Sequence, residues 1–407
     1  MNTYIRHLNN GIVLLMEKMR EIDSVSLGIF VKAGAINETP EESGVSHYIE
    51  HMMFKGTSKR SAKDISEEID NEGGNINAYT SRSKTVYYVK MLSDKIEKGI
   101  DILSDMILNS NFNQEELDKE RKVIVEEIKM YEDIPEETVH DENIRRVING
   151  IYGNTILGTE ESLNGIERAN FIKYYKDMYK PTNMVISVVG NIDFDKIYNQ
   201  INKKFGKFKN SAKERKYNKD FEILTGENII KRKTSQVHLC VNTRDLSIID
   251  ERRYASTIVS NILGGGMSSR LFQKIREERG LAYSIYSYGS NFIEGGIFTV
   301  YAGTTKKDHK KVIDIIKKEF YEIKKNGIEE KELERSKNQI LSGLVFALEN
   351  SRNKMEKTAN SYILYGKIIK VRELVKQINK ITMDDIAEIV DFMFDEKYYS
   401  STILGDV

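Results

Sequence analysis

Residues 166–178 read IERANFIKYYKDM, and residues 381–393, which lie 215 positions later, read ITMDDIAEIVDFM. The two stretches carry matching apolar residues and align without a gap. Each has the spacing of an amphipathic helix and leads into an apolar, strand-like segment that ends in a glycine, Gly190 in the first copy and Gly405 in the second. A constant offset between two such units is typical of an internal repeat. Because any two helix–strand units resemble each other to some degree, a second match is needed.

That second match lies upstream, where ELDKER at 116–121 resembles ELER at 332–335 at an offset of 216. Two matches at nearly one spacing favour a true duplication. In both halves, strand-like segments such as 85–91 and 297–302 alternate with long helical patterns. We therefore expect an α+β fold with two duplicated domains, each an antiparallel sheet with helices packed mainly on one face.

A polar stretch near the middle of the chain separates the two copies. Residues 206–218 are rich in Lys, Asn and Ser and are the best candidate for a linker. The sequence therefore predicts a first domain at 1–208, a linker at 209–221 and a homologous second domain at 222–407.

Composition restricts the class of protein. The 407 residues include 62 Lys and Arg and 62 Asp and Glu, and this balance gives no overall attraction to nucleic acid or to acidic membranes. The single cysteine, Cys240, excludes an internal disulfide and fits a reducing compartment. Apolar runs such as 184–189 are far shorter than the roughly 20 residues of a membrane-spanning helix, and the N-terminus lacks a signal-peptide layout. We expect a cytoplasmic protein with no nucleic-acid or membrane partner.

The sharpest local motif is HYIEH at 47–51. A helix is expected to begin within 39–43 and to stop near Gly56. On that helix His47 and His51 are one turn apart and share a face, where two imidazoles can hold one Zn²⁺. Glu50 lies beside them and can act on a metal-bound water as a general base. The alternative is a helix surface with two hydrogen-bonded histidines.

A hydrolytic zinc site usually takes a third protein ligand. The helical pattern at 114–132 offers Glu120 and Glu127, which are seven residues apart and therefore share a face. Val123 and Ile124 lie between them, so we expect that face to be partly buried. A metal explains a half-buried carboxylate at Glu127, and support of the site explains Glu120. The alternative is a solvated acidic helix with Glu–Lys pairs.

These residues resemble the pitrilysin family of metallopeptidases, which carries an inverted zinc motif, and in particular its small bacterial members, which are similar to a subunit of the mitochondrial processing peptidase. The resemblance covers essentially the whole chain. It implies one Zn²⁺ per chain, held by His47, His51 and Glu127. It also implies that Glu50 activates water and that Glu120 supports the site.

The resemblance extends to two substrate elements. Residues 73–81, GGNINAYTS, are similar to the family's edge strand, along which a peptide adds as an extra strand, and the matching positions are Asn77, Ala78 and Tyr79. Without the family these residues read as an ordinary hairpin strand. Arg276 and Tyr283 match a pair that holds the substrate backbone near the scissile bond.

The resemblance also implies an activity and an assembly. We expect a zinc-dependent endopeptidase that hydrolyses short or unfolded peptides in an enclosed chamber. Four such domains enclose the chamber in this family, so a chain with two predicts a homodimer in which Arg276 and Tyr283 complete the partner's site. The alternatives are a non-catalytic partner subunit and a peptide-binding holdase.

The second half has no zinc motif, and the offset of 216 sets Gly343 opposite Glu127, so we expect that half to be non-catalytic. His238 and Cys240 alternate on one predicted strand and are expected to pack there without a metal. His140 lies in a charged setting and is expected to be solvated.

Overall fold

The computed structural model describes residues 3–210, 212, 215, 217 and 219–407. The chain forms two compact units, each assembled from separate segments. Unit 1 comprises residues 1–129, 154–218 and 346–369, and unit 2 comprises residues 130–153, 219–345 and 370–407. The predicted linker at 209–221 lies partly outside the described residues.

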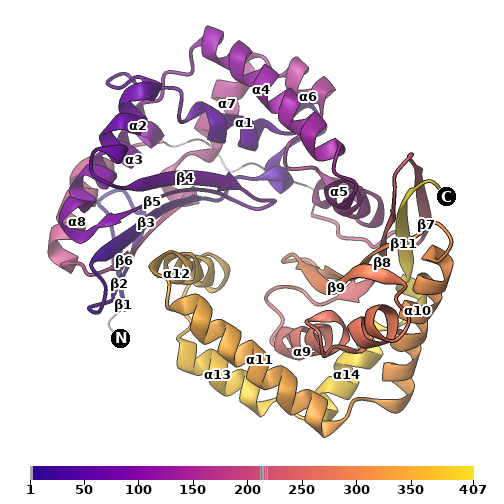
Figure 1. Ribbon diagram of the computed structural model, residues 1–407. Coiled ribbons are helices and arrows are strands. Elements are labelled where there is room, and N and C mark those ends of the chain that lie inside the picture. The colour runs from indigo at the N-terminus through magenta and orange to yellow at the C-terminus, as the bar shows by residue number, and fades with distance from the viewer. Residues whose placement is uncertain (1–2, 211, 213–214, 216, 218) are drawn as a thin grey trace. The chain divides into compact units, whose positions relative to one another are not determined.

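The described residues of unit 1 form a six-stranded sheet in the order β1-β2-β6-β3-β5-β4 (Figure 1). Neighbouring strands are antiparallel except β2 and β6, which are parallel. The strands are β1 Thr3–His7, β2 Val13–Lys18, β3 Ser24–Val31, β4 Asn75–Thr80, β5 Thr85–Leu92 and β6 Met184–Gly190.

One face of this sheet carries the main core of unit 1. Alternating residues such as Leu27 and Ile29 of β3 are buried there against helices. The helices of unit 1 are α1 Val45–Met52, α2 Ala62–Asp70, α3 Ile96–Asn109, α4 Gln114–Glu132, whose last residues lie in unit 2, α6 Glu160–Gly165, α7 Arg168–Met178, α8 Phe194–Phe205 and α12 Ser351–Tyr365. Short helical turns are η1 Ala35–Asn37, η2 Pro40–Glu42, η3 Ser93–Lys95 and η5 Pro181–Asn183.

Unit 2 contains a five-stranded sheet, among the described residues, in the order β7-β11-β8-β10-β9. Its strands are β7 Gly226–Lys231, β8 Val237–Asp245, β9 Ala282–Asn291, β10 Gly296–Thr304 and β11 Ser400–Gly405. Its helical segments are α5 Pro135–Val147, η4 Gly150–Gly153, α9 Arg253–Gly264, the π-helix η6 Phe272–Glu277, α10 His309–Asn326, α11 Glu330–Leu348, whose last residues lie in unit 1, α13 Val371–Lys380, α14 Met383–Met393 and η7 Glu396–Tyr398.

The two sheets repeat each other, as the duplicated sequence predicts. β2, β6, β3, β5 and β4 correspond in order and direction to β7, β11, β8, β10 and β9. The repeat glycines are equivalent in detail: Gly190 has a φ of 155° and Gly405 a φ of 156°. A Cβ at Gly190 would lie 2.4 Å from the Ser24 carbonyl oxygen, so this position requires glycine.

The predicted α+β fold of two duplicated halves is confirmed, with one difference in strand pairing. Each sheet contains one parallel pair, β2 with β6 and β7 with β11, where fully antiparallel sheets were expected. Parallel neighbours need a long crossover connection, and the long segments between these strands supply it.

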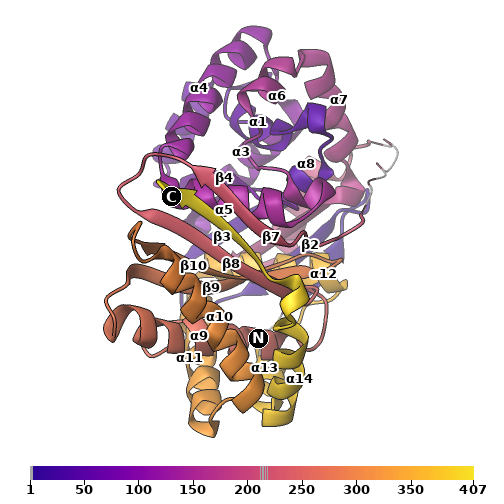
Figure 2. The ribbon, with the colours of Figure 1, turned by 90° about the vertical axis from the view of Figure 1, so that its right-hand side faces the viewer.

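Each sheet is also covered on its second face by one helix from the opposite half of the sequence. The helix α12 packs on β6 and β3 in unit 1, where Met355 and Ala359 are buried (Figure 1). The helix α5 packs on β11 and β8 in unit 2, where Val139 is buried (Figure 2). The domain limits 1–208 and 222–407 therefore stay a prediction for the two sequence repeats. The compact units have different limits, because α12 of the second half belongs to unit 1 and α5 of the first half belongs to unit 2.

No helix in the described part of the chain has the length and apolar character needed to cross a bilayer.

Candidate metal centre

The helix α1 carries the HYIEH motif and has a specific start. The turn η2 occupies residues 40–42, and α1 begins at Val45 after Gly44, whose φ is 89°. A Cβ at Gly44 would lie 2.5 Å from the Leu157 carbonyl oxygen. The buried carboxylate of Glu38 accepts hydrogen bonds from the backbone N–H groups of Gly44 (2.7 Å) and Ser46 (2.8 Å). Glu38 therefore caps the metal-site helix from outside the helix.

The helix α4 brings the acidic residues to α1. Leu117 and Ile124 are buried, and the Tyr48 hydroxyl of α1 donates a hydrogen bond to the Leu117 carbonyl. Ile124 is fully buried as expected, but Val123 is 52% exposed, because the helix buries the adjacent side of this face. Glu120 and Glu127 both lie on the side of α4 that faces α1.

Three ligand atoms converge between these helices. The Nε2 atoms of His47 and His51 lie 3.2 Å apart. Oε2 of Glu127 lies 3.4 Å from Nε2 of His51 and 3.9 Å from Nε2 of His47. Zinc–ligand bonds of about 2.0–2.1 Å set the corners of a tetrahedron about 3.3 Å apart. The three atoms are therefore spaced like three corners of a tetrahedral zinc site.

The hydrogen bonding of these side chains also fits a metal. Oε2 of Glu127 and Nδ1 of His47 are buried without a hydrogen-bond partner in the described residues. An unsatisfied buried carboxylate oxygen is costly unless a cation binds it. Within the described residues, these three side chains are the one group of acidic, histidine and cysteine side chains whose ligand atoms all lie within 4.8 Å. The residues present therefore fit a zinc ion.

Glu120 orients His51. Its Oε1 lies 2.9 Å from Nδ1 of His51, so this nitrogen donates and Nε2 is left facing His47 and Glu127. Its Oε2 pairs with the Lys55 ammonium at 2.6 Å. Burial opposes the ionised form of Glu120, but the hydrogen bonds from His51 and Lys55 outweigh burial and lower its pKa. Lys55 was not identified from the sequence, because it lies in the turn just after α1, where no helical spacing relates it to His51.

The two imidazoles differ in their affinity for a proton. Burial, reinforced by the neighbouring His51, lowers the pKa of His47 to about 4. Burial also opposes protonation of His51, but the carboxylates of Glu120 and Glu127 outweigh it and raise the pKa of His51 to about 9. The site therefore attracts positive charge at neutral pH.

Glu50 lies on α1 outside the ligand group. Its Oε2 accepts a hydrogen bond of 2.6 Å from the Thr80 hydroxyl at the end of β4. Burial raises the pKa of the Glu50 carboxyl. A carboxylate with a raised pKa is suited to taking up a proton near neutral pH. Thr80 was not identified from the sequence, since nothing in a strand pattern marks a contact with a distant helix.

The predicted substrate strand is β4. Among the described strands it pairs only with β5, so its other edge is free. The Ala78 amide donates to the Asn77 side chain at 2.8 Å. In an edge strand, the backbone polar groups of every second residue point away from the neighbouring strand. Because the Ala78 N–H bonds to a side chain and not to β5, Ala78 is such a residue, and its N–H faces the free edge.

Arg276 and Tyr283 lie together in unit 2. The guanidinium carbon of Arg276 lies 5.0 Å from the centroid of the Tyr283 ring and 4.7 Å from that of Phe272. Tyr283 is 77% exposed, so its side chain is available to a ligand. The structure brings this predicted pair together, and its role stays a prediction.

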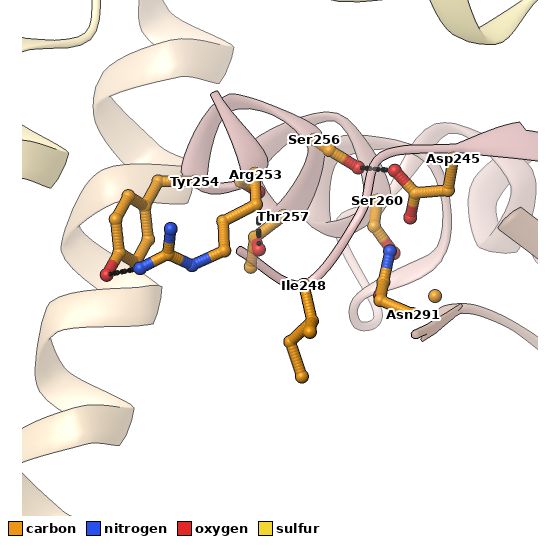
Figure 3. Close-up of a pocket in the computed structure, with 9 residues that line it drawn as sticks. Asp245, Ile248, Arg253, Tyr254, Ser256, Thr257, Ser260 and Asn291 are labelled. Carbon is orange, nitrogen blue, oxygen red and sulfur yellow. Dashed lines mark hydrogen bonds between the residues drawn. The ribbon is translucent and has the colours of Figure 1, made fainter. Parts of the chain in front are cut away.

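Unit 2 also contains a polar cavity of about 250 Å³ beside the start of α9 (Figure 3). Its buried carboxylate, Asp245, accepts hydrogen bonds from the Ser256 hydroxyl (2.6 Å) and the Leu246 amide (2.7 Å). Arg253 donates to the Tyr254 hydroxyl at the opposite end. The hydrogen bonds from Ser256 and Leu246 explain how the buried Asp245 carboxylate is satisfied.

Known proteins resemble this chain over its whole length. Residues 13–160 match the family described as Insulinase (Peptidase family M16), and residues 165–340 match the Peptidase M16 inactive domain. A protein of Bacillus subtilis named uncharacterized zinc protease YmxG is 38% identical over 394 residues, which cover 96% of this chain and 95% of that protein. An uncharacterized zinc protease of Rickettsia felis is 36% identical over 412 residues, covering 99% and 98%.

Solved structures have the same fold. A protease from Helicobacter pylori has a TM-score of 0.91 at 19% identity and covers 99% of each chain. A structure from Pseudomonas fluorescens, described as a peptidase M16 inactive domain, has a TM-score of 0.91 at 18% identity and covers 100% of this chain and 98% of that one. Fold, paired metal-ligand helices and relatives agree on a two-domain peptidase architecture. The chain belongs to the insulinase family, peptidase family M16, which is the resemblance that the sequence motifs indicate.

Proposed function

We propose that the protein is a zinc-dependent endopeptidase for short or unfolded peptides. The observation that carries the proposal is the convergence of His47, His51 and Glu127 at tetrahedral spacing, with Glu50 beside them. Relatives that are named zinc proteases, and the match to the insulinase family, support the same proposal.

His47, His51 and Glu127 would hold the zinc, one ion per chain, and Glu120 would fix the orientation of His51. When bound, the ion supplies Lewis acidity, which lowers the pKa of water and polarises a peptide carbonyl. The protein's contribution is to present three ligands on two helices and to leave the remaining position open.

Glu50 is the proposed general base. Its carboxylate takes a proton from the attacking water and gives that proton to the leaving amine. The Thr80 hydroxyl holds Oε2 of Glu50 and so fixes the orientation of the carboxylate for this transfer. The raised pKa of Glu50 favours proton uptake during the reaction.

The edge strand β4 is the proposed binding site for the peptide backbone. An added peptide strand would replace the Asn77 side chain as the acceptor for the Ala78 amide. Main-chain pairing of this kind accepts many sequences. Tyr79 continues the same strand toward Thr80, which contacts the base, so the strand leads a peptide toward the reacting groups.

Arg276 and Tyr283 would grip a substrate carbonyl or stabilise a developing oxyanion. We place them, in a homodimer, at the active site of the partner subunit. The proposed location is the cytoplasm, which fits a single buried cysteine and balanced charge.

The test is zinc-dependent cleavage of a mixed peptide library. The purified protein is assayed as isolated, after removal of metal with a chelator, and after reloading with one equivalent of zinc. Cleavage that disappears and returns with zinc supports the proposal. Zinc binding without cleavage under any condition contradicts it.

The alternatives within this family are a non-catalytic partner subunit and a peptide-binding holdase. The match of residues 165–340 to an inactive domain favours a non-catalytic role for the second half. The first half retains three metal ligands and a base, which favours the enzyme. Turnover compared with binding affinity for the same peptide distinguishes a holdase from a peptidase.

A further inference from the structure

The helix α12 comes from the second half of the sequence but packs beneath the sheet that carries the proposed peptide-binding strand. Met355 and Ala359 anchor it in a small core on the face of the sheet opposite the main core. This core also includes Tyr88 of β5, with Tyr79 of β4 packed against it. The helix itself lies on β6 and β3 (Figure 1), and its small core extends through Tyr88 to Tyr79 near the free edge of the sheet.

At that edge the contacts between α12 and the sheet are polar. The Arg352 guanidinium lies over the Tyr88 ring, with its carbon 4.0 Å from the ring centroid. Nε of Arg352 donates to Oε1 of Glu356 at 3.0 Å. Burial and the neighbouring Glu356 carboxylate raise the pKa of Tyr79, so this carboxylate lies close to the Tyr79 phenol. Tyr88 is the strand partner of Asn77, so both contacts act on the segment that carries Ala78.

Unit 2 contains a similar arrangement. The imidazole of His140 on α5 lies 2.7 Å from the Tyr288 hydroxyl and 2.8 Å from the Tyr286 hydroxyl, both on the edge strand β9. The Tyr286 hydroxyl donates to Glu136, one turn before His140 on α5, at 3.1 Å. The prediction that His140 is solvated is wrong, because α5 lies across the second sheet.

The two arrangements occupy equivalent positions in the repeat. For the helices, the equivalence follows from the offset of 216 between α5 and α12. For the edge strands, it follows from the residue pairing across each sheet, from Gly190 on β6 to β4 and from Gly405 on β11 to β9. The corresponding pairs are Glu136 and Arg352, His140 and Glu356, Tyr286 and Asn77, and Tyr288 and Tyr79. In unit 2, His140 contacts Tyr288 of the edge strand β9. In unit 1, the equivalent residue Glu356 lies beside Tyr79 of the edge strand β4.

We propose that Glu356 and Arg352 are positioning residues that hold Tyr79 and thereby set the edge strand β4 for pairing with a peptide. This inference rests on the proposed function, because it assumes that β4 is the strand to which the peptide adds. An edge strand has a neighbour on one side only, so its backbone is fixed less firmly than that of an inner strand. A side-chain contact next to Ala78 reduces the freedom of the amide that receives the peptide.

The inference gives the second half of the chain a defined task. That half lacks the zinc motif, yet its helix α12 supplies the charged side chains of Arg352 and Glu356 beside the proposed peptide-binding strand. Specific loss of peptide affinity, with zinc site and fold intact, is the signature of this role. A contact that only stabilised the fold would not distinguish a peptide that pairs through its backbone from one that does not.

The test measures peptide affinity in the Glu50→Gln background, where turnover does not interfere. The probe is a fluorescein-labelled, unstructured peptide of mixed sequence, and its dissociation constant is read by fluorescence anisotropy. We expect Glu356→Ala and Tyr79→Phe each to weaken binding about fivefold, and the double variant to weaken it no further, because both remove one contact. Glu356→Gln, which keeps an acceptor for the Tyr79 hydroxyl, should retain most of the affinity.

Two controls separate this role from general stability. Glu67→Ala removes an exposed ion pair with Lys63, also four residues apart on a helix, and should leave affinity unchanged. The same peptide with alternate backbone amides N-methylated cannot pair as a strand, so it should bind weakly and should not respond to Glu356→Ala. Zinc content should be equal in all variants.

Equal affinities in the parent, Glu356→Ala and Tyr79→Phe proteins would overturn the inference, as would absence of peptide binding to any of them. Tyr79→Phe removes a single hydroxyl and serves if Glu356→Ala does not fold. Because affinity is measured without turnover, a failure of the unmodified protein to cleave peptides would overturn the proposed function and leave a Glu356-dependent affinity standing.

Discussion

Nδ1 of His51 lies 2.9 Å from Oε1 of Glu120, and this contact determines which nitrogen of His51 faces the metal position. Glu120 is itself held by Lys55 at 2.6 Å. Lys55 and Glu120 would therefore orient His51, a proposed zinc ligand, without binding the ion themselves.

Replacement of Glu120 by alanine should lower zinc affinity by about 10–100-fold, because His51 would lose the partner that fixes its ring orientation. The measurement is a zinc titration in competition with a chromophoric chelator. Glu115→Ala, on the exposed side of the same helix, is the matched control and should bind zinc like the parent protein. Equal affinities for Glu120→Ala and the parent would show that His51 does not depend on this contact.

Replacement of Glu127 by glutamine should remove bound zinc after dialysis, because a neutral amide is a poor zinc ligand. The loss of zinc affinity should exceed the roughly 100-fold loss expected when a residue that only supports a ligand is removed. Zinc per chain is measured by atomic absorption. Glu126→Gln alters the neighbouring carboxylate, which is 74% exposed and paired with Lys129, and should retain one zinc per chain. Zinc retained by Glu127→Gln would require a different third ligand.

Glu38 should make stability depend on pH. Burial raises its pKa from 4.5 to about 7, so its contribution is fully present below pH 4.5 and is lost as pH rises through about 7. The difference in unfolding free energy between the parent and Glu38→Gln should therefore be larger near pH 5 than near pH 8, as measured by urea denaturation. A difference that does not change with pH would mean that Glu38 keeps an ordinary pKa.

The buried pair Glu17–Lys354 should hold α12 on the first sheet. The two charges lie 3.1 Å apart and are almost fully buried, at 8% and 6% exposure. Lys354→Ala leaves Glu17 buried and unpaired, which should lower the unfolding free energy by about 3–5 kcal/mol. The double variant Glu17→Gln/Lys354→Met should be closer to the parent protein in urea denaturation. Equal losses in the single and double variants would contradict this account of how α12 is held.

Active sites completed between subunits should allow complementation. Glu50→Gln chains and Arg276→Ala chains are each expected to be inactive alone. If Arg276 acts on the partner's site, an equal mixture after subunit exchange should regain about a quarter of the parent activity, since half of the dimers are mixed and each has one complete site. No recovery, or a single-chain mass in light scattering of an active sample, would show that each site is completed within one chain.

The fold, and the grouping of His47, His51 and Glu127, could be predicted because both depend on spacing along the chain. Helix periodicity places His47, Glu50 and His51 close together on one helix. The repeat is visible in the sequence because each copy keeps a glycine, Gly190 or Gly405, at the same unusual backbone conformation. The two-helix metal group needs, in addition, the family resemblance, because spacing alone does not tell which face of α4 meets α1.

Contacts between distant segments could not be predicted. The helical pattern at 351–365 indicates a helix but not which sheet it covers, so the placement of α12 on the first sheet was missed. Thr80 and Lys55 become recognisable only when β4, α1 and α4 are together in space. His140 was expected in solvent for the same reason, since its neighbours are charged in sequence but aromatic in the fold.

The most direct test of the central claim compares the parent protein with Glu50→Gln for two quantities in the same sample, zinc per chain and the rate of peptide cleavage. The account predicts one zinc per chain in both proteins and cleavage only in the parent, because Glu50 is proposed to move a proton and not to bind the ion. Near-normal cleavage by Glu50→Gln, or no zinc in a carefully handled parent sample, would contradict it.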